Sequence, residues 1–189
     1  GCLLIDADYS QIELRVLAHM AKDENMLHAF QTGEDIHTQT AAQVFDLPVS
    51  MVTHEMRSRA KAVNFGIVYG IGAFSLSKNI GVSVAEADAY IKSYLKTYNG
   101  IARYMEQTVE QAGKDGFVTT MLGRRRYLPE LQSTNKNIQA FGRRVAMNAP
   151  IQGTAADIIK IAMTGVNRRL KEKQMKSRLV LQVHDELLI

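Results

Sequence analysis

Short apolar segments at the two ends of the chain constrain its fold most. Residues 2–6 read Cys-Leu-Leu-Ile-Asp, and residues 179–183 and 187–189 are also apolar, so all three are predicted strands. A strand needs a neighbour to pair its backbone N–H and C=O groups. Because almost nothing precedes the first segment and the sequence stops partway through the last, we expect it to be a fragment of a longer chain.

The sequence between these strands is predicted to be mostly helical. Apolar side chains recur at helical spacing, with Gly and Pro as breaks. The predicted helices cover residues 23–31, 36–45, 53–69, 73–79, 84–98, 101–112, 135–149 and 154–170. We expect Ser10 to cap a further helix, with Glu13 at its capping-box position, and residues 117–122 to form a strand. Pro150 is expected to weaken or kink the helix around it.

Composition excludes several classes of protein. A chain of 189 residues with 46% hydrophobic and 22% charged residues is typical of a globular protein. The single cysteine, Cys2, excludes an internal disulfide framework and favours a reducing compartment. No apolar run approaches the roughly 20 residues of a membrane span, so we expect a soluble, cytoplasmic protein. The net charge of +4 is only a mild bias toward polyanions.

One helix carries cations and aromatic rings along a single stripe. Arg57, Lys61, Phe65 and Tyr69 are spaced four apart, so in a helix they lie on one face about 18 Å long. The two cations suit phosphate oxygens, and the two rings suit a sugar and a base. Gly66 leaves room for a flat group to approach. The alternative is an amphipathic helix with a solvated cationic edge and buried aromatic residues.

Carboxylates follow the strands at both ends of the chain. Asp8 lies just past the first strand, and Asp185 and Glu186 lie in the turn of the last hairpin. Adjacent carboxylates repel one another unless a cation lies close. Asp8 alone could be a simple turn residue, and a lone His-Asp pair is weak support for a metal site.

Two further polar groups could contact a polyanion. Arg124, Arg125 and Arg126 form the densest positive cluster and fit either a solvated charge run or a phosphate-backbone contact. The other group recurs at helical spacing and consists of Arg144, Asn148 and Gln152. Such a row of hydrogen-bond donors could test the minor-groove edges of base pairs, although a polar surface face is the common explanation.

The acidic ends and the cationic helix together predict nucleotidyl transfer. Two metal ions about 3.5–4 Å apart, held by Asp8 and Asp185, would stabilise the in-line transition state of phosphoryl transfer. Hard oxygen ligands favour Mg²⁺.

Three motifs resemble those of the A-family DNA polymerases. Residues 8–15 (DYSQIELR) are similar to motif A, residues 57–70 (RSRAKAVNFGIVYG) to motif B, and residues 183–186 (VHDE) to motif C, in the family's order. The intervening RRRYLPE and APIQGTAAD are similar to bacterial members. One departure is Ser58, where relatives often carry a second Arg; it puts only a peripheral contact in doubt.

The resemblance implies an α+β fold, shaped as a right hand. Its palm is an antiparallel sheet with helices, expected at residues 1–19 and 140–189, and its mostly helical fingers are expected at residues 20–139. The implied partners are primer-template DNA and deoxynucleoside triphosphates, with two Mg²⁺ ions as cofactor and a monomeric protein at the bacterial nucleoid. We expect little or no activity from these 189 residues alone.

The resemblance also implies residue roles. Asp8 and Asp185 are metal ligands with the carbonyl of Tyr9, and Glu186 is a secondary acidic group. The implied nucleotide contacts are Arg57, Lys61 (also catalytic), His37, Phe65, Tyr69, Gln11 and Glu13, the last a steric gate against a ribose 2′ hydroxyl. The implied DNA contacts are Arg124, Arg125, Arg144, Asn148, Gln152 and His184.

Three alternatives stay open at this point. A single-subunit RNA polymerase shares the two aspartates and a similar helix, but Glu13 is bulky where such an enzyme should be open. A His-Asp metal phosphohydrolase would need several clustered His and Asp ligands. A non-catalytic DNA-binding remnant is disfavoured because both carboxylates are present.

Overall fold

The computed structural model describes residues 2–189, so Gly1, the first residue of the expected palm, lies outside the described residues. The helices are α1 (Ile12–Ala21), α2 (Glu24–Gln31), α3 (Ile36–Val44), α4 (His54–Val68), α5 (Ala73–Ile80), α6 (Val84–Thr97), α7 (Asn99–Asp115) and α8 (Lys136–Glu172), with short 3₁₀ turns at Val49–Met51 and Pro129–Gln132. The strands are β1 (Asp6–Asp8), β2 (Phe117–Thr119), β3 (Arg125–Tyr127), β4 (Leu181–Val183) and β5 (Glu186–Leu188). The α+β class is confirmed.

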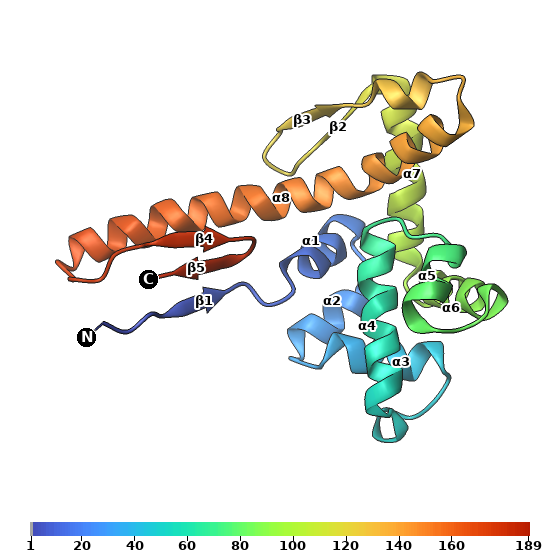
Figure 1. Cartoon of the computed structure of the whole chain (residues 1–189), viewed down its shortest axis with the longest axis horizontal. Helices are drawn as coiled ribbons and strands as arrows, with labels where there is room; N and C mark the ends of the chain where they lie inside the picture. Colours follow the sequence, from blue (N-terminus) through green and yellow to red (C-terminus); the bar gives the residue numbers. More distant parts are fainter. Residues whose placement is uncertain (1) are drawn as a thin grey trace.

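A three-stranded antiparallel sheet brings the two ends of the chain together (Figure 1). Its order is β1-β5-β4, and the register pairs Asp8 with Glu186 and Val183 with Glu186. The predicted strand at residues 2–6 was misplaced, because β1 begins at Asp6 and the apolar residues before it are exposed. Only Ile5 extends the pairing, through two 2.9 Å backbone hydrogen bonds with Ile189.

The core lies among the helices of the middle segment. Leu14 and Leu17 of α1 pack with Met26, Tyr94 and Ile101, and all five side chains are buried. The helices predicted between residues 23 and 112 are confirmed, with ends that differ by a few residues. Thr53, Asp35 and Ser83 each cap a helix by accepting a backbone N–H bond. This helical body fixes the position of α4.

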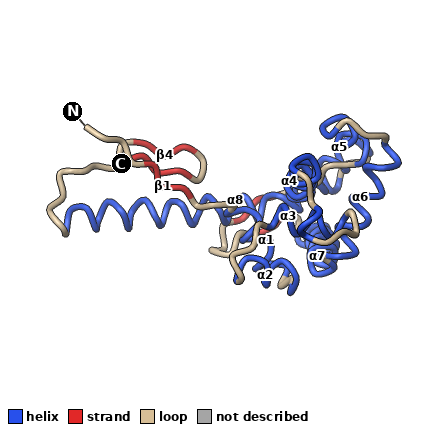
Figure 2. Tube along the Cα trace, turned by 90° about the horizontal axis from the view of Figure 1, so that it is seen from below, coloured by secondary structure: helices blue, strands red, loops and turns tan. Residues whose placement is uncertain are grey.

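A single helix of 37 residues, α8, replaces the two predicted helices at residues 135–149 and 154–170. Pro150 lies inside it without ending it, so the expected break was wrong. Pro150 is buried, and Thr154 Oγ1 donates to the Pro150 carbonyl at 2.6 Å. Packing therefore outweighs the loss of one helical N–H. The C-terminal half of α8 runs alongside the sheet, which Figure 2 shows from below.

A second, two-stranded sheet pairs β2 with β3. The predicted strand at residues 117–122 is too long, because it ends at Thr119, and Gly123 makes the turn with φ of +81°. The partner strand β3 lies in the arginine cluster and was not predicted. Charged residues on a two-stranded ribbon give no apolar alternation to find.

The start of α1 differs from the prediction. Gln11, not Ser10, precedes the helix, and no side chain caps it. Glu13 therefore has no capping-box role and is free for another contact. The expected boundaries at residues 19/20 and 139/140 fall inside α1 and α8, so continuous helices join the two parts, and the division into palm and fingers stays a prediction.

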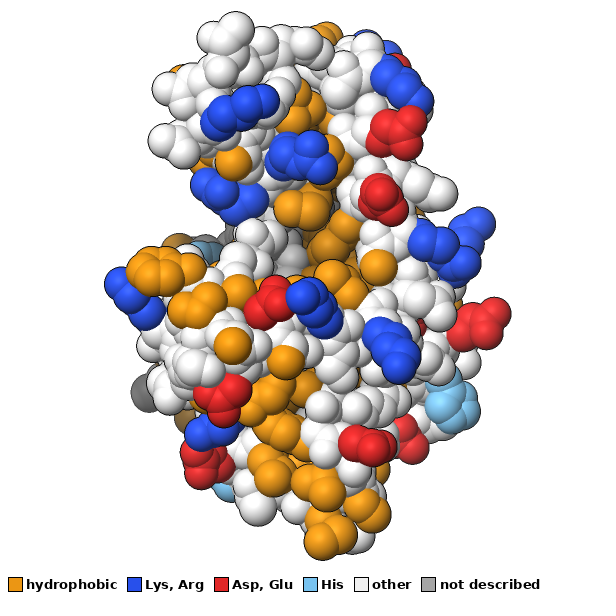
Figure 3. Space-filling model, turned by 90° about the vertical axis from the view of Figure 1, so that its right-hand side faces the viewer, with side chains coloured by type: hydrophobic (Ala, Val, Ile, Leu, Met, Phe, Trp, Pro, Cys, Tyr) orange, Lys and Arg blue, Asp and Glu red, His pale blue; other side chains and the backbone are white. Residues whose placement is uncertain are grey.

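The surface on the side of α5, α6 and α7 carries mixed charge. Figure 3 shows Lys and Arg side chains interspersed with Asp and Glu on this face. Although the chain has a net charge of +4, the Lys and Arg side chains on this face do not form one continuous basic strip.

Candidate functional site

Asp8 and Asp185 lie side by side, although 176 positions separate them in the chain. The β1-β5 register places Asp8 opposite Glu186, and the Tyr9 N–H donates to the Asp185 carbonyl at 3.2 Å. Desolvation and then the negative charges of Asp185 and Asp6 raise the pKa of Asp8. Among residues 2–189, no cationic group is among the causes of that shift. Neighbouring carboxylates are groups that bind hard cations.

A cavity of about 520 Å³ opens beside these carboxylates. Three helices and the β4-β5 turn surround it. Its walls include Gln11, Glu13, Phe65, Tyr69, Gln152, His184 and Asp185. Seven predicted site residues from distant parts of the chain thus share one cavity, which makes it the candidate active site.

Glu13 and Tyr69 meet in this cavity. The Tyr69 hydroxyl donates to Glu13 Oε2 at 3.0 Å. Burial raises the pKa of Glu13, and burial together with the charge of Glu13 raises the pKa of Tyr69 to about 12. Tyr69 therefore stays protonated near neutral pH and holds the carboxylate in place.

The two cations of the α4 stripe, Arg57 and Lys61, differ in their contacts. Arg57 donates two hydrogen bonds to Asp35, from Nε to Oδ1 at 3.0 Å and from Nη2 to Oδ2 at 2.7 Å. Arg57 Nη1 takes no part in this ion pair. Hydrogen bonding to Arg57 holds the pKa of Asp35 well below its usual range. Lys61 is exposed one turn further along. The stripe is confirmed as one face of α4, but its first cation already has a carboxylate partner that the sequence reading missed.

His37 is buried rather than displayed on the surface, with an exposed fraction of 2%. Its Nδ1 lies 2.9 Å from the amide nitrogen of Asn64, and its ring centroid lies 5.8 Å from that of Phe65. Burial lowers the pKa of His37, and Arg57 and Lys61 lower it further against the opposing effect of Asp35. The ring is therefore neutral near pH 7.

The polar row on α8 points to the end of α4. Asn148 donates to the Tyr69 carbonyl at 3.1 Å, while its own Oδ1 is buried without a hydrogen-bond partner among residues 2–189. Arg144 lines a second cavity of about 720 Å³, whose walls also include Phe65 and Tyr69. Gln152 lines the first cavity. Arg144 and Gln152 thus line the two cavities that share Phe65 and Tyr69.

Gly66 has a packing role that differs from the expected one. A Cβ there would lie 2.5 Å from Ile71 Cγ2, so the glycine admits a neighbouring side chain of the protein. Gly66 nevertheless also lines the 720 Å³ cavity. The idea that it leaves room for a flat ligand stays a prediction.

Arg124 and Arg125 make contacts within the protein. Arg124 donates to Asp157 Oδ1 at 2.9 Å and to the Gly153 carbonyl at 3.0 Å, which ties the β2-β3 ribbon to α8. The guanidinium of Arg125 lies 4.6 Å from the centre of the Phe117 ring. Their predicted DNA contacts would have to be made in addition to these.

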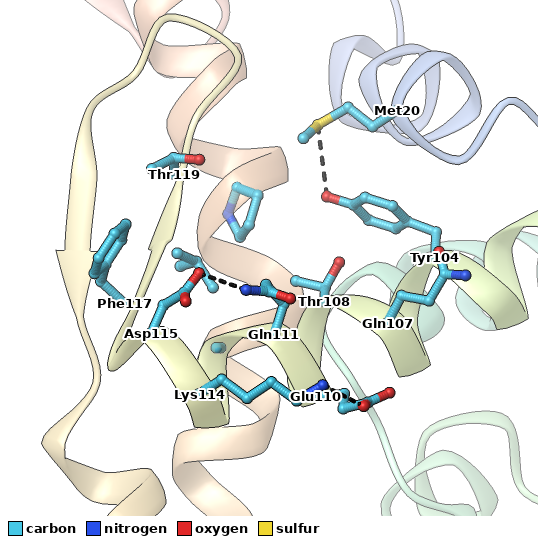
Figure 4. Close-up of a pocket in the computed structure, with 13 residues that line it drawn as sticks. Met20, Tyr104, Gln107, Thr108, Glu110, Gln111, Lys114, Asp115, Phe117 and Thr119 are labelled. Atoms are coloured by element: carbon cyan, nitrogen blue, oxygen red, sulfur yellow. Dashed lines mark hydrogen bonds and ion pairs between the residues drawn. The ribbon is translucent and has the colours of Figure 1, made fainter.

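A third cavity, of about 550 Å³, lies between α7, β2 and Pro150 (Figure 4). Its polar groups are mostly paired: Lys114 with Glu110 at 2.6 Å, and Gln111 with Asp115 at 2.8 Å. None of the predicted site residues lines it. It is therefore a weaker candidate.

Metal-binding groups in residues 2–189 are limited to pairs. No cluster of three or more His, Cys, Asp or Glu side chains arranged for a metal occurs in this part of the chain. Mg²⁺ is commonly held by one or two carboxylates together with water and substrate phosphates, so the Asp8–Asp185 pair fits this ion. The Tyr9 carbonyl, the third predicted ligand, accepts one hydrogen bond among residues 2–189, from the Ile12 N–H at 3.3 Å. Over the described residues, none of the helices combines the length and apolarity that crossing a bilayer requires.

Comparisons with known proteins agree with this geometry. DNA polymerase I of Bacillus subtilis (strain 168) is 58% identical over 186 residues, which cover 98% of this chain and 21% of the relative. DNA polymerase I of Caldicellulosiruptor bescii is 53% identical over 189 residues, which cover 100% of this chain and 22% of the relative. The chain thus spans about a fifth of the length of these curated relatives.

Both the fold and the family model give the same assignment. The POL domain of Pol1 from M. smegmatis, solved in complex with DNA primer-template and dNTP, superposes with a TM-score of 0.93 at 47% identity, over 98% of this chain and 33% of that one. The family model for DNA polymerase family A matches residues 1–189. The chain therefore belongs to DNA polymerase family A.

Proposed function

We propose that the natural polypeptide carrying this chain extends a primer by template-directed DNA synthesis. It joins a deoxynucleoside triphosphate to the primer 3′ hydroxyl and releases pyrophosphate, as DNA replication and repair require. The observation that carries the proposal is that Asp185, adjacent to Asp8, lines the same cavity as Glu13, Phe65 and Tyr69. Acidic side chains, including the proposed steric gate, and two aromatic rings thus line one cavity.

Asp8, Asp185 and the Tyr9 carbonyl are the groups that would hold two Mg²⁺ ions. Bound Mg²⁺ would lower the barrier by neutralising charge on the transferred phosphoryl group and on the pyrophosphate. Glu186, opposite Asp8 in the sheet, adds negative charge next to the pair.

The α4 stripe would bind the nucleotide. Lys61 is exposed and unshielded by a carboxylate in the described residues, so it suits the triphosphate and can donate to its oxygens. Arg57 reaches the same oxygens with the nitrogen that Asp35 leaves open. Phe65 and Tyr69 flank the sugar and base, and Glu13, held by Tyr69, fills the space that a 2′ hydroxyl would need.

The DNA would lie along α8 and the β4-β5 turn. Gln152 and His184 line the cavity beside Asp185, so they are placed to meet the primer end. Arg144 and Asn148 continue the row toward the second cavity, where the next template base can be accommodated. We also propose that the protein is a monomer associated with the bacterial nucleoid; the relatives support the bacterial origin.

A primed-template extension assay tests the proposal. We expect the full natural polypeptide to add deoxynucleotides in Mg²⁺ and to discriminate strongly against ribonucleotides, with residues 1–189 alone weakly active or inactive. Preferential use of ribonucleotides would favour an RNA polymerase instead. DNA binding without extension by the full polypeptide would identify a non-catalytic remnant and contradict the proposal.

A further inference from the structure

A buried chain of hydrogen bonds links α3 and α4 beneath the cationic stripe. Tyr98 Oη lies 3.1 Å from Thr40 Oγ1, Thr40 Oγ1 donates to Asn64 Oδ1 at 3.1 Å, and Asn64 Nδ2 lies 2.9 Å from His37 Nδ1. All four side chains are at most 2% exposed. Asn64 lies between Lys61 and Phe65 on α4, so this chain connects the motif B helix to the core.

The direction of each bond follows from the number of hydrogens available. A threonine hydroxyl has one hydrogen, and Thr40 gives it to the Asn64 carbonyl oxygen, so Thr40 must accept from Tyr98. Burial raises the pKa of Tyr98 to about 12, which keeps this donor protonated. The Asn64 amide nitrogen can only donate, so His37 Nδ1 must accept.

Only one hydrogen position is then left on the imidazole ring. With Nδ1 accepting and the ring neutral, the hydrogen lies on Nε2. Nε2 forms no hydrogen bond among residues 2–189, so it is the atom available to a ligand. Asp35, Arg57 and Lys61 all influence His37 electrostatically. Because Asp35 is paired with Arg57, Lys61 leaves a positive charge nearby, so that ligand is expected to be anionic.

We infer that Asn64 is a positioning residue that, oriented by Thr40 and Tyr98, fixes His37 in the tautomer with hydrogen on Nε2. His37 then offers a donor to the triphosphate without presenting a lone pair or requiring a second positive charge. A ring free to change tautomer would present a lone pair to the phosphate oxygens part of the time. The phosphate contact rests on the proposed function, whereas the tautomer does not.

The tautomer can be measured directly. Long-range ¹H–¹⁵N correlation spectra of the ¹⁵N-labelled chain resolve the rings of its five histidines, and a His37→Gln variant assigns the relevant one. We expect a single neutral form with hydrogen on Nε2 near pH 7. Hydrogen on Nδ1 in the unsubstituted chain would overturn the inference.

Variants test whether the network imposes this tautomer. Thr40→Val keeps the side-chain shape but removes the donor to Asn64, so the amide can rotate and a fraction of His37 should move to the Nδ1–H form. Thr40→Ser keeps the hydroxyl and should leave the spectrum unchanged. Asn64→Leu provides the stronger perturbation, and Thr40→Val remains informative if Asn64→Leu fails to fold. A tautomer that is the same in Thr40→Val and wild type contradicts the role of the network.

Steady-state kinetics of the full polypeptide then test the link to nucleotide. We expect Thr40→Val to raise the KM for the deoxynucleotide several-fold, up to about tenfold, with a smaller change in kcat, and Thr40→Ser to restore it. Failure of the wild-type polypeptide to extend a primer would overturn the proposed function but leave the spectroscopic result valid. An active wild type whose KM is unaffected by Thr40→Val would overturn the positioning role.

Discussion

The Tyr69 hydroxyl donates a 3.0 Å hydrogen bond to Glu13 Oε2 and so joins the end of α4 to the start of α1. These residues are 56 positions apart in the sequence, and neither caps its own helix with this side chain. The bond fixes a carboxylate that would otherwise have several rotamers. Under the proposed function, sugar selection would therefore depend on Tyr69, which holds Glu13, as well as on Glu13 itself.

Loss of the Tyr69 hydroxyl should weaken sugar discrimination. In the full polypeptide, Glu13→Ala is expected to lower the ratio of kcat/KM for deoxy- over ribonucleotides by at least about tenfold, because it empties the space of the gate. Tyr69→Phe keeps the aromatic ring but removes the hydrogen bond that holds the Glu13 carboxylate. We expect it to lower the same ratio by about two- to tenfold. Equal discrimination in wild type and Glu13→Ala would remove Glu13 from the gate.

Substitution of either metal carboxylate should abolish chemistry without abolishing DNA binding. Asp8→Asn and Asp185→Asn keep side-chain size but remove the charge that binds a cation. We expect single-turnover incorporation to fall by about a thousandfold or more, with primer-template affinity within about threefold of wild type. Normal turnover by Asp8→Asn would exclude it as a ligand. Asp6→Asn, on the same strand, is the matched control and should retain activity.

The Asp35–Arg57 ion pair should make the free energy of unfolding depend on pH under acidic conditions. The pKa of Asp35 is lowered below 3.8 in the folded state, so its contribution is fully present above that value and is lost as pH falls through the folded pKa. Asp35→Asn should therefore lower the free energy of unfolding at pH 5–7. Both side chains are 39% exposed, so solvent screening limits the loss to less than about 1 kcal/mol.

Urea denaturation between pH 2 and 7 measures this difference. Asn caps a helix about as well as Asp, so the variant keeps the bond from the Thr38 N–H and isolates the ion pair. The difference in unfolding free energy between wild type and Asp35→Asn should narrow below pH 4. The same difference should be absent when both proteins also carry Arg57→Gln. A gap that stays constant down to pH 2 would assign the loss to something other than the charge of Asp35.

Thr154 should stabilise the contact between the β2-β3 ribbon and α8. Its buried hydroxyl accepts from the Met121 N–H at 3.0 Å and donates to the Pro150 carbonyl. Thr154→Val keeps the shape but leaves the Met121 donor without its acceptor, which should cost about 1–3 kcal/mol of unfolding free energy. Thr154→Ser is the control that retains both bonds. Equal melting temperatures for the Val variant and wild type would contradict this account.

The helical body was predictable because its signals are local. Asp23, Asp35, Thr53 and Ser83 cap helices at the positions that the sequence indicates, and apolar spacing defines the buried faces between them. The long helix was missed because the rule that Pro ends helices considers only the backbone. At Pro150 the buried environment favours continuity over one hydrogen bond.

The sequence motifs identified the residues of the candidate site better than the residues that hydrogen-bond to them. The motifs identified Asp8, Asp185 and the α4 stripe. The structure brings Asp185, Phe65 and Tyr69 to one cavity, with Asp8 next to Asp185. Asp35 and Asn64 were missed because each acts through a contact more than 20 positions away, which leaves no periodic signal. An acid two residues before His37 was the one available hint that α3 contributes charge to the site.

The unbroken course of α8 has a consequence for how such a sequence can change. At about 1.5 Å per residue its 37 residues span about 55 Å, from the β2-β3 ribbon to the acidic sheet. Inserting or deleting one residue between Arg144 and Gln152 would turn everything beyond it by about 100°, so that one of the two would leave the aromatic pair. Substitutions can accumulate along this segment, but changes of length cannot.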